Sequence, residues 1–587
     1  MSKPTRWHRG IALLRDRIPE VGVGTLAPSR TMGCMTCKSR RIKCDRGTPR
    51  CLNCSTRNLT CPGYSKTLRW KEKHQLIPST AVENKGHHVP SSVTTPTLTP
   101  TPTPGALSVD RGASPMLVGP CPSEALPFND KMAVLLAYYF HSVCAINSCF
   151  DSFVNPLRTE VAALLTTSRL IEFCILSMSA AHLSNSHPHW SLEGLGYLTA
   201  TVSELSRAMN AVITVRPLSS AADQDLGTVL LGVIMLGMTT SWHASSGLGL
   251  EHISGSRALF RTWIAQEFTS GHAFDGAWPR LHFYLGLQAY WEAMASFLID
   301  QDIHQLDYLH ISFAIDRMKA VTVHPWTGIS AVPWLYLAKA GCVIRGQRHR
   351  DRGETLRDGT SRTKKAVMAP RPLLSEESHV AHGLAKELLH YRPPSDAQIE
   401  DTFDEHTSKS QLQDLARCCQ LAALVELIRS CDSVDEQQAM ATLIADNCMG
   451  TSSAATCTDL LRDLSVQILR LLSGIPTDSG TRCLYHLPLL IAGSVLLPSI
   501  MSLSHTPSGD VTSDKGSACL YWRRFVMERV MHLEQSVNLE AHRRIRLLLT
   551  EVWARADALT VPQYQALTPR SLHWVDVMED ANLRFFV

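Results

Sequence analysis

The chain has 587 residues, which is more than a single hydrophobic core usually organises, so we expect several domains joined by linkers. Hydrophobic residues make up 44% and charged residues 19%, a composition that excludes a wholly disordered or fibrous protein. Residues 1–29 carry a net charge of +3 and residues 30–73 carry +10, so the other 514 residues carry −9 of the total of +4. A basic head on an acidic body predicts a polyanion-binding module attached to a body with another role.

Four zones follow one another along the chain. Residues 1–32 are a basic leader without hydrophobic periodicity, which we expect to be disordered. Residues 33–64 contain six of the eighteen cysteines. Residues 65–127 include the run TTPTLTPTPTPG (94–105), and such Pro/Thr/Ser-rich sequence predicts an extended linker because it cannot bury enough apolar surface to offset its ordering entropy. Residues 128–587 form the acidic body.

The body predicts an all-α domain, because apolar residues recur at helical spacing and strand-like alternation is scarce. We find no repeat of 20–50 residues, so a helical solenoid is not expected. Helices are expected at 131–150, 158–185, 196–214, 222–243, 283–300, 411–430, 458–474, 519–537 and 540–557. Polar insertions are expected near 346–372 and 504–516, and residues 574–587 (WVDVMEDANLRFFV) predict a final amphipathic helix docked on the domain rather than an activation segment.

Secretion and membrane insertion are not predicted. Charged residues at 15–17 interrupt the N-terminal apolar stretch, which therefore does not resemble a signal peptide. The apolar runs Leu226–Met238 and Leu487–Leu503 are not clean spans of about 18 apolar residues, so we interpret both as buried core helices. We therefore expect a soluble protein without a membrane partner, whose thiols lie in a reducing compartment.

The six clustered cysteines lie in two halves of identical spacing, C-x2-C-x6-C. They are Cys34, Cys37 and Cys44 in the first half and Cys51, Cys54 and Cys61 in the second. Structural zinc takes four ligands in a tetrahedron, so one ion would leave two thiols over and two ions need eight ligand positions. Six cysteines fill eight positions if two of them bridge both ions, and the repeat favours the equivalent first cysteines, Cys34 and Cys51. The cluster therefore predicts two Zn²⁺ ions, whereas a RING-type module or a double zinc ribbon would need eight ligands.

The two x6 segments differ in charge. The first, KSRRIK (38–43), carries four cations, whereas the second, STRNLT (55–60), carries only Arg57. Metal geometry explains the shared spacing but not this asymmetry. Arginine can pair bidentately with guanine and both cations can neutralise phosphates, so we expect the first segment to contact DNA. A solvated charged face or a nuclear-import signal is the alternative interpretation.

The segment GCMTCKSRRIKCDRGTPRCLNCSTRNLTCPGY (33–64) resembles the DNA-binding domain of fungal zinc binuclear cluster (Gal4-type) transcription factors. The resemblance implies a small two-zinc domain with two short helices around the metals, in which the first and fourth cysteines, Cys34 and Cys51, bridge the ions. It also implies that the first helix enters the major groove, where basic residues before the third cysteine read CGG-like triplets.

Carried over to this sequence, the resemblance makes Arg40 and Arg41 the candidates for base contacts. Lys38, Lys43 and Arg46 are the candidates for phosphate contacts. The family very often has lysine where this chain has Arg41. Because both side chains can donate to guanine, we expect recognition of G-rich triplets to persist.

Three segments of the body resemble the fungal-specific transcription factor domain, in the subclass typified by acriflavine-sensitivity regulators. They are AYWEAMASFL (289–298), YHLPLLIAGSVLL (485–497) and LLLTEVWARAD (547–557). The resemblance implies an all-helical regulatory domain over most of 128–587.

An enzyme is not predicted. The sequence has no nucleophile elbow, phosphate-binding loop, H-E-x-x-H helix or dinucleotide fingerprint after a strand. The adjacent Cys418 and Cys419 lie in a helical pattern and predict buried thiols rather than a redox pair. A metalloenzyme is disfavoured because closed zinc sites would use all six clustered cysteines and leave no coordination position for a substrate.

The sequence therefore predicts a nuclear, sequence-specific regulator of RNA polymerase II genes that binds double-stranded promoter DNA with CGG-like triplets. Transcription machinery or co-regulators are its expected protein partners, and the resemblance implies control of a metabolic or secondary-metabolite pathway. A homodimer would form without an evident coiled coil, because residues 65–77 offer about one heptad. The alternative function is a zinc-dependent protein–protein interaction or scaffold module, which would not need the basic first segment.

Overall fold

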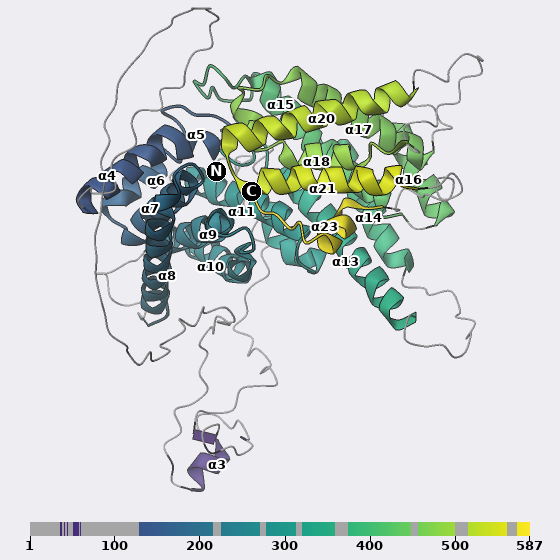
Figure 1. The fold of residues 1–587 in the computed structure, drawn as a ribbon. Helices are drawn as coiled ribbons and strands as arrows, with labels where there is room; N and C mark the ends of the chain where they lie inside the picture. Colours follow the sequence, from purple (N-terminus) through teal and green to yellow (C-terminus); the bar gives the residue numbers. More distant parts are fainter. Residues whose placement is uncertain are drawn as a thin grey trace, which may run out of the picture. The chain divides into compact units, whose positions relative to one another are not determined.

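The chain divides into two compact units, Met1–Ser123 and Glu124–Val587, in the computed structural model (Figure 1). The described residues are 36–37, 40, 44, 51–57 and 59 in the first unit, and 128–214, 225–269, 278–312, 320–358, 374–431, 433–447, 456–498, 515–559 and 572–587 in the second. The expected leader (1–32) and the expected linker (65–127) lie entirely outside these residues, so their boundaries stay predictions.

Helices make up the regular structure of the second unit, which confirms the all-α prediction. Its principal helices are α4 (Phe128–Tyr138), α5 (Cys144–Ile146), α6 (Glu160–Ala163), α7 (Arg169–Ser184), α8 (Ser191–Thr214), α9 (Leu226–His243), α10 (Ile253–Thr269), α11 (Trp278–Ser296), α13 (Val332–Asp358), α14 (Leu374–His390), α15 (Lys409–Arg429), α16 (Val434–Asn447), α17 (Cys457–Gly474), α18 (His486–Ser494), α20 (Lys515–Val537), α21 (Glu540–Asp557) and α23 (Trp574–Asp580). Among the described residues, strand-type pairing is limited to two isolated bridges, Val321 with Ile399 and His324 with Gly328.

The helices pack on their neighbours in chain order. The first half of the unit stacks α7 against α8 and α9, and α9 against α10. The second half runs from α11 through α13, α15 and α17 to α18, which α20 and α21 cover as an adjacent pair (Figure 1). Short connections between consecutive helices make such local packing the expected arrangement.

The single helix expected at 158–185 is wrong, because the chain turns sharply within it. The stretch from α6 to Thr166 and the helix α7 meet at 116°. Ser168 sits at the turn, where its Oγ accepts a hydrogen bond from the backbone N–H of Ile171 and begins α7. The apolar periodicity continued across the turn, so it did not reveal the break.

The polar insertion expected at 346–372 is also wrong over its first part, because α13 continues to Asp358. Arginines at the start of this stretch and just before it pair with acids distant in sequence. Arg345 bonds Glu579 at 2.6 Å, and Arg348 bonds Asp576 at 3.1 Å. These partners lie more than 220 residues away, which is why the local sequence looked like a solvated loop. Residues 359–372 lie outside the described residues.

The helix α9 has the length and apolar composition to cross a membrane, but 78% of it is buried inside the unit. A core helix of a soluble protein meets the same criteria, and the packing of α9 against α7, α8 and α10 gives it that place. The expectation that Leu226–Met238 is a core helix is therefore confirmed.

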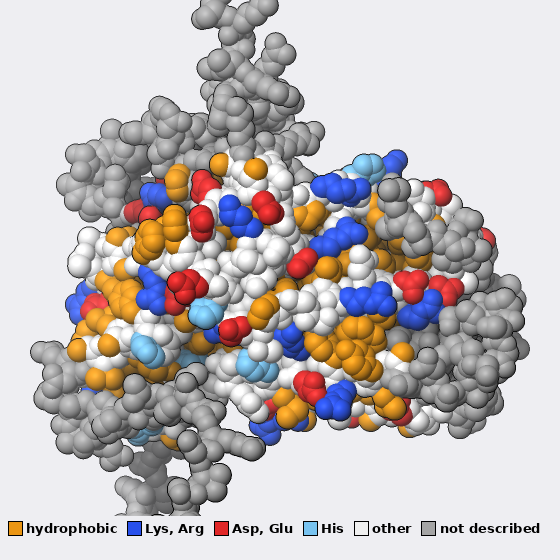
Figure 2. All heavy atoms as spheres, turned by 90° about the horizontal axis from the view of Figure 1, so that it is seen from above, with side chains coloured by type: hydrophobic (Ala, Val, Ile, Leu, Met, Phe, Trp, Pro, Cys, Tyr) orange, Lys and Arg blue, Asp and Glu red, His pale blue; other side chains and the backbone are white. Residues whose placement is uncertain are grey.

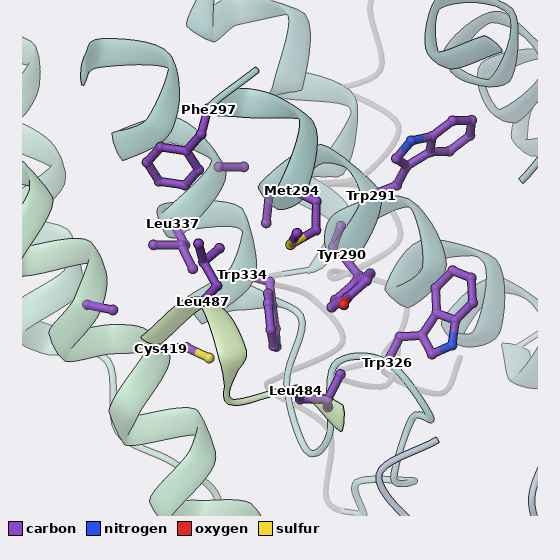
Figure 3. Close-up of a cluster of buried hydrophobic side chains, with 14 of the residues drawn as sticks. Tyr290, Trp291, Met294, Phe297, Trp326, Trp334, Leu337, Cys419, Leu484 and Leu487 are labelled. Carbon is purple, nitrogen blue, oxygen red and sulfur yellow. The ribbon is translucent and has the colours of Figure 1, made fainter. Parts of the chain in front are cut away.

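Aromatic side chains fill the centre of the second unit (Figure 3). Tyr290 on α11 lies 5.1 Å from the Trp334 ring on α13 and 5.6 Å from Trp326, measured between ring centroids. Trp291 is fully buried. Pairs of tilted rings at these distances add to the stabilisation from buried apolar area. The aromatic residues of the 289–298 segment thus serve core packing.

The C-terminal segment is docked as expected. Within α23, Trp574 and Met578 are at most 1% exposed, and the Trp574 ring lies 5.1 Å from that of Phe297, which directly follows α11. The indole N–H of Trp574 donates to Glu426 at 2.8 Å. The acids and aromatics of this segment therefore have partners inside the domain.

Gly237 tests how closely α9 approaches α11. A Cβ at this position would lie 2.4 Å from the Trp291 ring, whereas a Cβ at Gly383 on α14 would meet nothing within 4 Å. We expect Gly237→Ala to lower the free energy of unfolding by about 1–3 kcal/mol through overpacking. Gly383→Ala, the matched control, should raise it by about 0.5–1 kcal/mol through helix propensity. Urea unfolding followed by circular dichroism measures both, and equal effects would contradict the close approach.

Candidate nucleic-acid interface

Each half of the cysteine repeat begins with a short helical turn. Thr36 and Cys37 are helical, and the backbone N–H of Arg40 donates to the Thr36 carbonyl at 3.3 Å. In the second half, α3 (Leu52–Ser55) follows Cys51, whose carbonyl accepts the backbone N–H groups of residues 54 and 55 at 3.1 and 3.0 Å. Residues three apart share a helix face, so a turn of this kind directs both sulfurs of a C-x2-C pair to one side.

The sulfur atoms of both halves converge on one another. Cys37 Sγ lies 3.6 Å from Cys51 Sγ and 3.9 Å from Cys54 Sγ. The Sγ atoms of Cys37, Cys44 and Cys51 all lie within 4.8 Å of one another. The side chains of Cys37, Cys51 and Cys54 are at most 1% exposed, so water does not reach these sulfurs.

These distances fit zinc better than a disulfide. A disulfide bond is about 2.05 Å long, far shorter than the separation of Cys37 and Cys51. A tetrahedral zinc ion with Zn–S bonds of about 2.3 Å places its sulfur ligands about 3.8 Å apart, and the observed 3.6 and 3.9 Å lie on either side of this value. The donor set therefore suits a structural zinc site.

The structure places part of the predicted site. Cys37, Cys44, Cys51 and Cys54 come together, and the side chain of Arg40 is exposed. The remaining predicted residues lie outside the described residues: Cys34, Cys61, Lys38, Arg41, Lys43 and Arg46.

Leu59 is a packing residue that the sequence analysis did not single out. It lies partly buried against the clustered cysteines, and its backbone N–H donates to the carbonyl of Cys54 at 2.9 Å. The signal was present, because Ile42 and Leu59 hold the same place two residues before the third cysteine of their halves. In the second half, Leu59 at this place covers part of the cysteine cluster.

The described residues of the second unit contain no comparable group of metal ligands. Burial raises the pKa of the Cys418 and Cys419 thiols, which keeps both protonated and favours core packing over redox chemistry. On the face of this unit shown in Figure 2, described Lys and Arg side chains lie among Asp and Glu side chains rather than forming one basic surface. The candidate interface therefore lies in the first unit.

Comparison with known families gives a match to each unit. Residues 32–71 match the fungal Zn(2)-Cys(6) binuclear cluster domain. Residues 134–587, most of the chain, match the fungal specific transcription factor domain. The chain belongs to this family of fungal transcription factors. Its relatives are regulators of transcription rather than enzymes, and the cluster domain identifies the converged cysteines as a zinc-binding site.

Curated relatives match short stretches of the chain. The chain is 46% identical to arginine metabolism regulation protein II of Saccharomyces cerevisiae over 46 residues, which are 8% of this chain and 5% of that protein. It is 59% identical to transcriptional regulatory protein moc3 of Schizosaccharomyces pombe over 32 residues, or 6% of each chain. It is 33% identical to acriflavine sensitivity control protein acr-2 of Neurospora crassa over 78 residues, or 13% of each. The matches thus span 5% to 13% of these relatives, and no solved structure matches the chain.

Removing one cluster thiol should release metal. We expect Cys37→Ala to lower the zinc content of the purified full chain, because the Cys37 sulfur lies close to that of Cys44 in its own half and to those of Cys51 and Cys54 in the other. Cys419→Ala, which removes a buried thiol of the second unit, is the matched control and should leave the zinc content unchanged. Elemental analysis of the purified proteins measures the ratio. Equal loss in both variants would contradict the assignment of zinc to the cluster.

Proposed function

We propose that this protein is a nuclear regulator of RNA polymerase II genes that binds promoter DNA through its zinc cluster. The observation that carries the proposal is the convergence of the cysteine sulfurs beside the basic segment 38–43. Membership of a transcription factor family supports it, since the body then acts as a regulatory domain. The names of two relatives refer to arginine metabolism and to the pestheic acid cluster, which supports control of a metabolic or secondary-metabolite pathway.

Two zinc ions per chain would use all six clustered thiolates as ligands. Six thiolates fill eight positions when Cys34 and Cys51 bridge both ions, and the placement of Cys51 beside Cys37 supports the bridging role of Cys51. Six thiolates with two Zn²⁺ carry a net charge of −2, which the surrounding Lys and Arg offset. Zinc coordination thereby holds the basic segment in a fixed orientation before the protein binds DNA.

The basic segment divides into readers and positioners. Arg40 and Arg41 are proposed to contact base edges of CGG-type triplets, whereas Lys38, Lys43 and Arg46 are proposed to contact phosphates. Two observations support this division: the helical turn at 36–40 gives a start for a recognition helix, and the Arg40 side chain is exposed. A module used only as a zinc-dependent protein–protein scaffold would not need these cations, so we favour DNA.

Substitution of one reader and one positioner tests the proposal. We expect Arg41→Ala to lower affinity for a CGG-containing duplex by about 1–3 kcal/mol while affinity for random duplex barely changes, because a bidentate base contact is lost. Lys43→Ala should weaken both duplexes alike and reduce the slope of log K against log salt by about one unit. Binding isotherms on both duplexes at several salt concentrations measure these effects.

Arg57→Ala in the second segment is the matched control and should leave the preference for CGG intact, since its side chain lies in the half that carries a single cation. Equal losses on both duplexes for Arg41→Ala would make this guanidinium a phosphate contact. If the unaltered protein shows no preference between the duplexes, the scaffold function takes the place of sequence-specific binding.

A further inference from the structure

The helix α8 lies at the outer edge of the helical body (Figure 1). Its solvent-exposed side is uncharged over most of its length. None of its exposed residues between 191 and 206 is charged, and Leu192, Leu195 and Val202 are 78%, 47% and 45% exposed. Solvent-facing sides of helices ordinarily carry charged and polar residues, because apolar side chains gain by leaving water. We call the exposed side of residues 192–206 the α8 face.

The hydroxyl groups of the α8 face need no water as an acceptor. Thr199, Ser203 and Ser206 each donate to the carbonyl four residues earlier, at 2.9 Å in all three cases. A polar group costs most to bury when its hydrogen bond is lost on leaving water. Since these donors keep their helix acceptors, the α8 face can be covered at little cost.

Two glycines of α8 differ in what surrounds them. A Cβ on Gly194 would lie 3.4 Å from the backbone nitrogen of Ala181, so the packing of α7 accounts for this glycine. A Cβ on Gly196 would meet nothing within 4 Å. Glycine weakens a helix interior, and no contact within the described chain accounts for Gly196. The close approach of another backbone would account for a glycine at this position.

We propose that the α8 face docks on the α8 face of a second copy of this chain, with the two helices antiparallel about a twofold axis at Thr199. In this register Leu192 lies opposite Ser206, Leu195 opposite Ser203, and Val202 opposite Gly196 of the other copy. In each of these three pairs, a larger side chain lies opposite a smaller residue. Interfaces with twofold symmetry are self-complementary in this way, because one patch serves both subunits.

The sequence of the α8 face favours a second copy over a different partner. Leu192 and Leu195 lie before Thr199, and the small Ser203 and Ser206 lie after it. Val202 and Gly196 are placed the other way round, so an antiparallel copy supplies a small residue opposite each large one. The charges at both ends of the face are already paired within the chain. Arg207 pairs with Glu204 at 2.6 Å, and Glu193 in the first turn pairs with Lys131 at 2.6 Å, so the pairing brings no uncompensated charge together. The inference is independent of the proposed DNA binding.

The interface should be modest in strength. Fifteen residues of helix extend about 22 Å, and one such helix pair buries less than the roughly 800 Å² per partner of a standard interface. We therefore expect a dissociation constant in the micromolar range.

Sedimentation equilibrium of the full-length chain, from about 1 to 100 µM, tests the pairing. The unaltered chain should form dimers, and Val202→Glu should raise the dissociation constant at least about a hundredfold, because each carboxylate would be buried without a partner. Leu520→Glu on α20, where the leucine is 66% exposed, is the matched control and should dimerise normally. A chain that stays monomeric, or a dimer that Val202→Glu leaves intact, would overturn the proposal.

Exchanging the large and the small residue of one pair distinguishes an effect on the interface from an effect on the fold. Gly196→Val should leave the helix content and melting temperature at least unchanged, because the space around this position is open, yet it should prevent dimers by meeting Val202 of the other copy. The double variant Gly196→Val with Val202→Gly restores a large residue opposite a small one and should dimerise again. A double variant that remains monomeric would overturn the antiparallel register.

Discussion

The cysteine-rich segment 34–61 depends on the convergence of its sulfurs, because its 28 residues are too few to build a hydrophobic core. Chains below about 40 residues usually need disulfides or a metal to fold. Among the described residues, Leu59 is the one non-cysteine apolar side chain packed on the cluster. Metal coordination therefore takes the place of a hydrophobic core.

The second unit has a large apolar core, and the charged side chains buried in it need partners of opposite charge. Arg257 is 6% exposed and holds the fully buried Glu292 through two hydrogen bonds, at 2.5 and 2.6 Å. A buried charge without a partner would cost far more than such a pair. The same rule holds between α13 and α23, where arginines and carboxylates neutralise one another. Arg257, Arg345 and Arg348 thus serve the fold of this unit.

The two units therefore differ in their chemistry. One combines a zinc-binding cysteine cluster with a short run of cations in its sequence, and the other is a helical body that matches the fungal specific transcription factor domain. A body that pairs through α8 would bring two zinc clusters into one particle even though residues 65–77 hold only about one heptad. Two clusters on one DNA molecule raise apparent affinity through effective concentration without any new base contact.

The sequence by itself determined the zinc site and the fold class, because both rest on local spacing. The C-x2-C-x6-C repeat places sulfurs within a few residues of one another, and apolar periodicity of 3.6 marks a helix wherever it runs unbroken. Only the tertiary structure decided that Arg345 and Arg348 have partners on α23, that the chain turns at Ser168, and that one side of α8 remains uncovered. Those outcomes depend on which residues far apart in sequence come into contact, and a one-dimensional pattern carries no record of that.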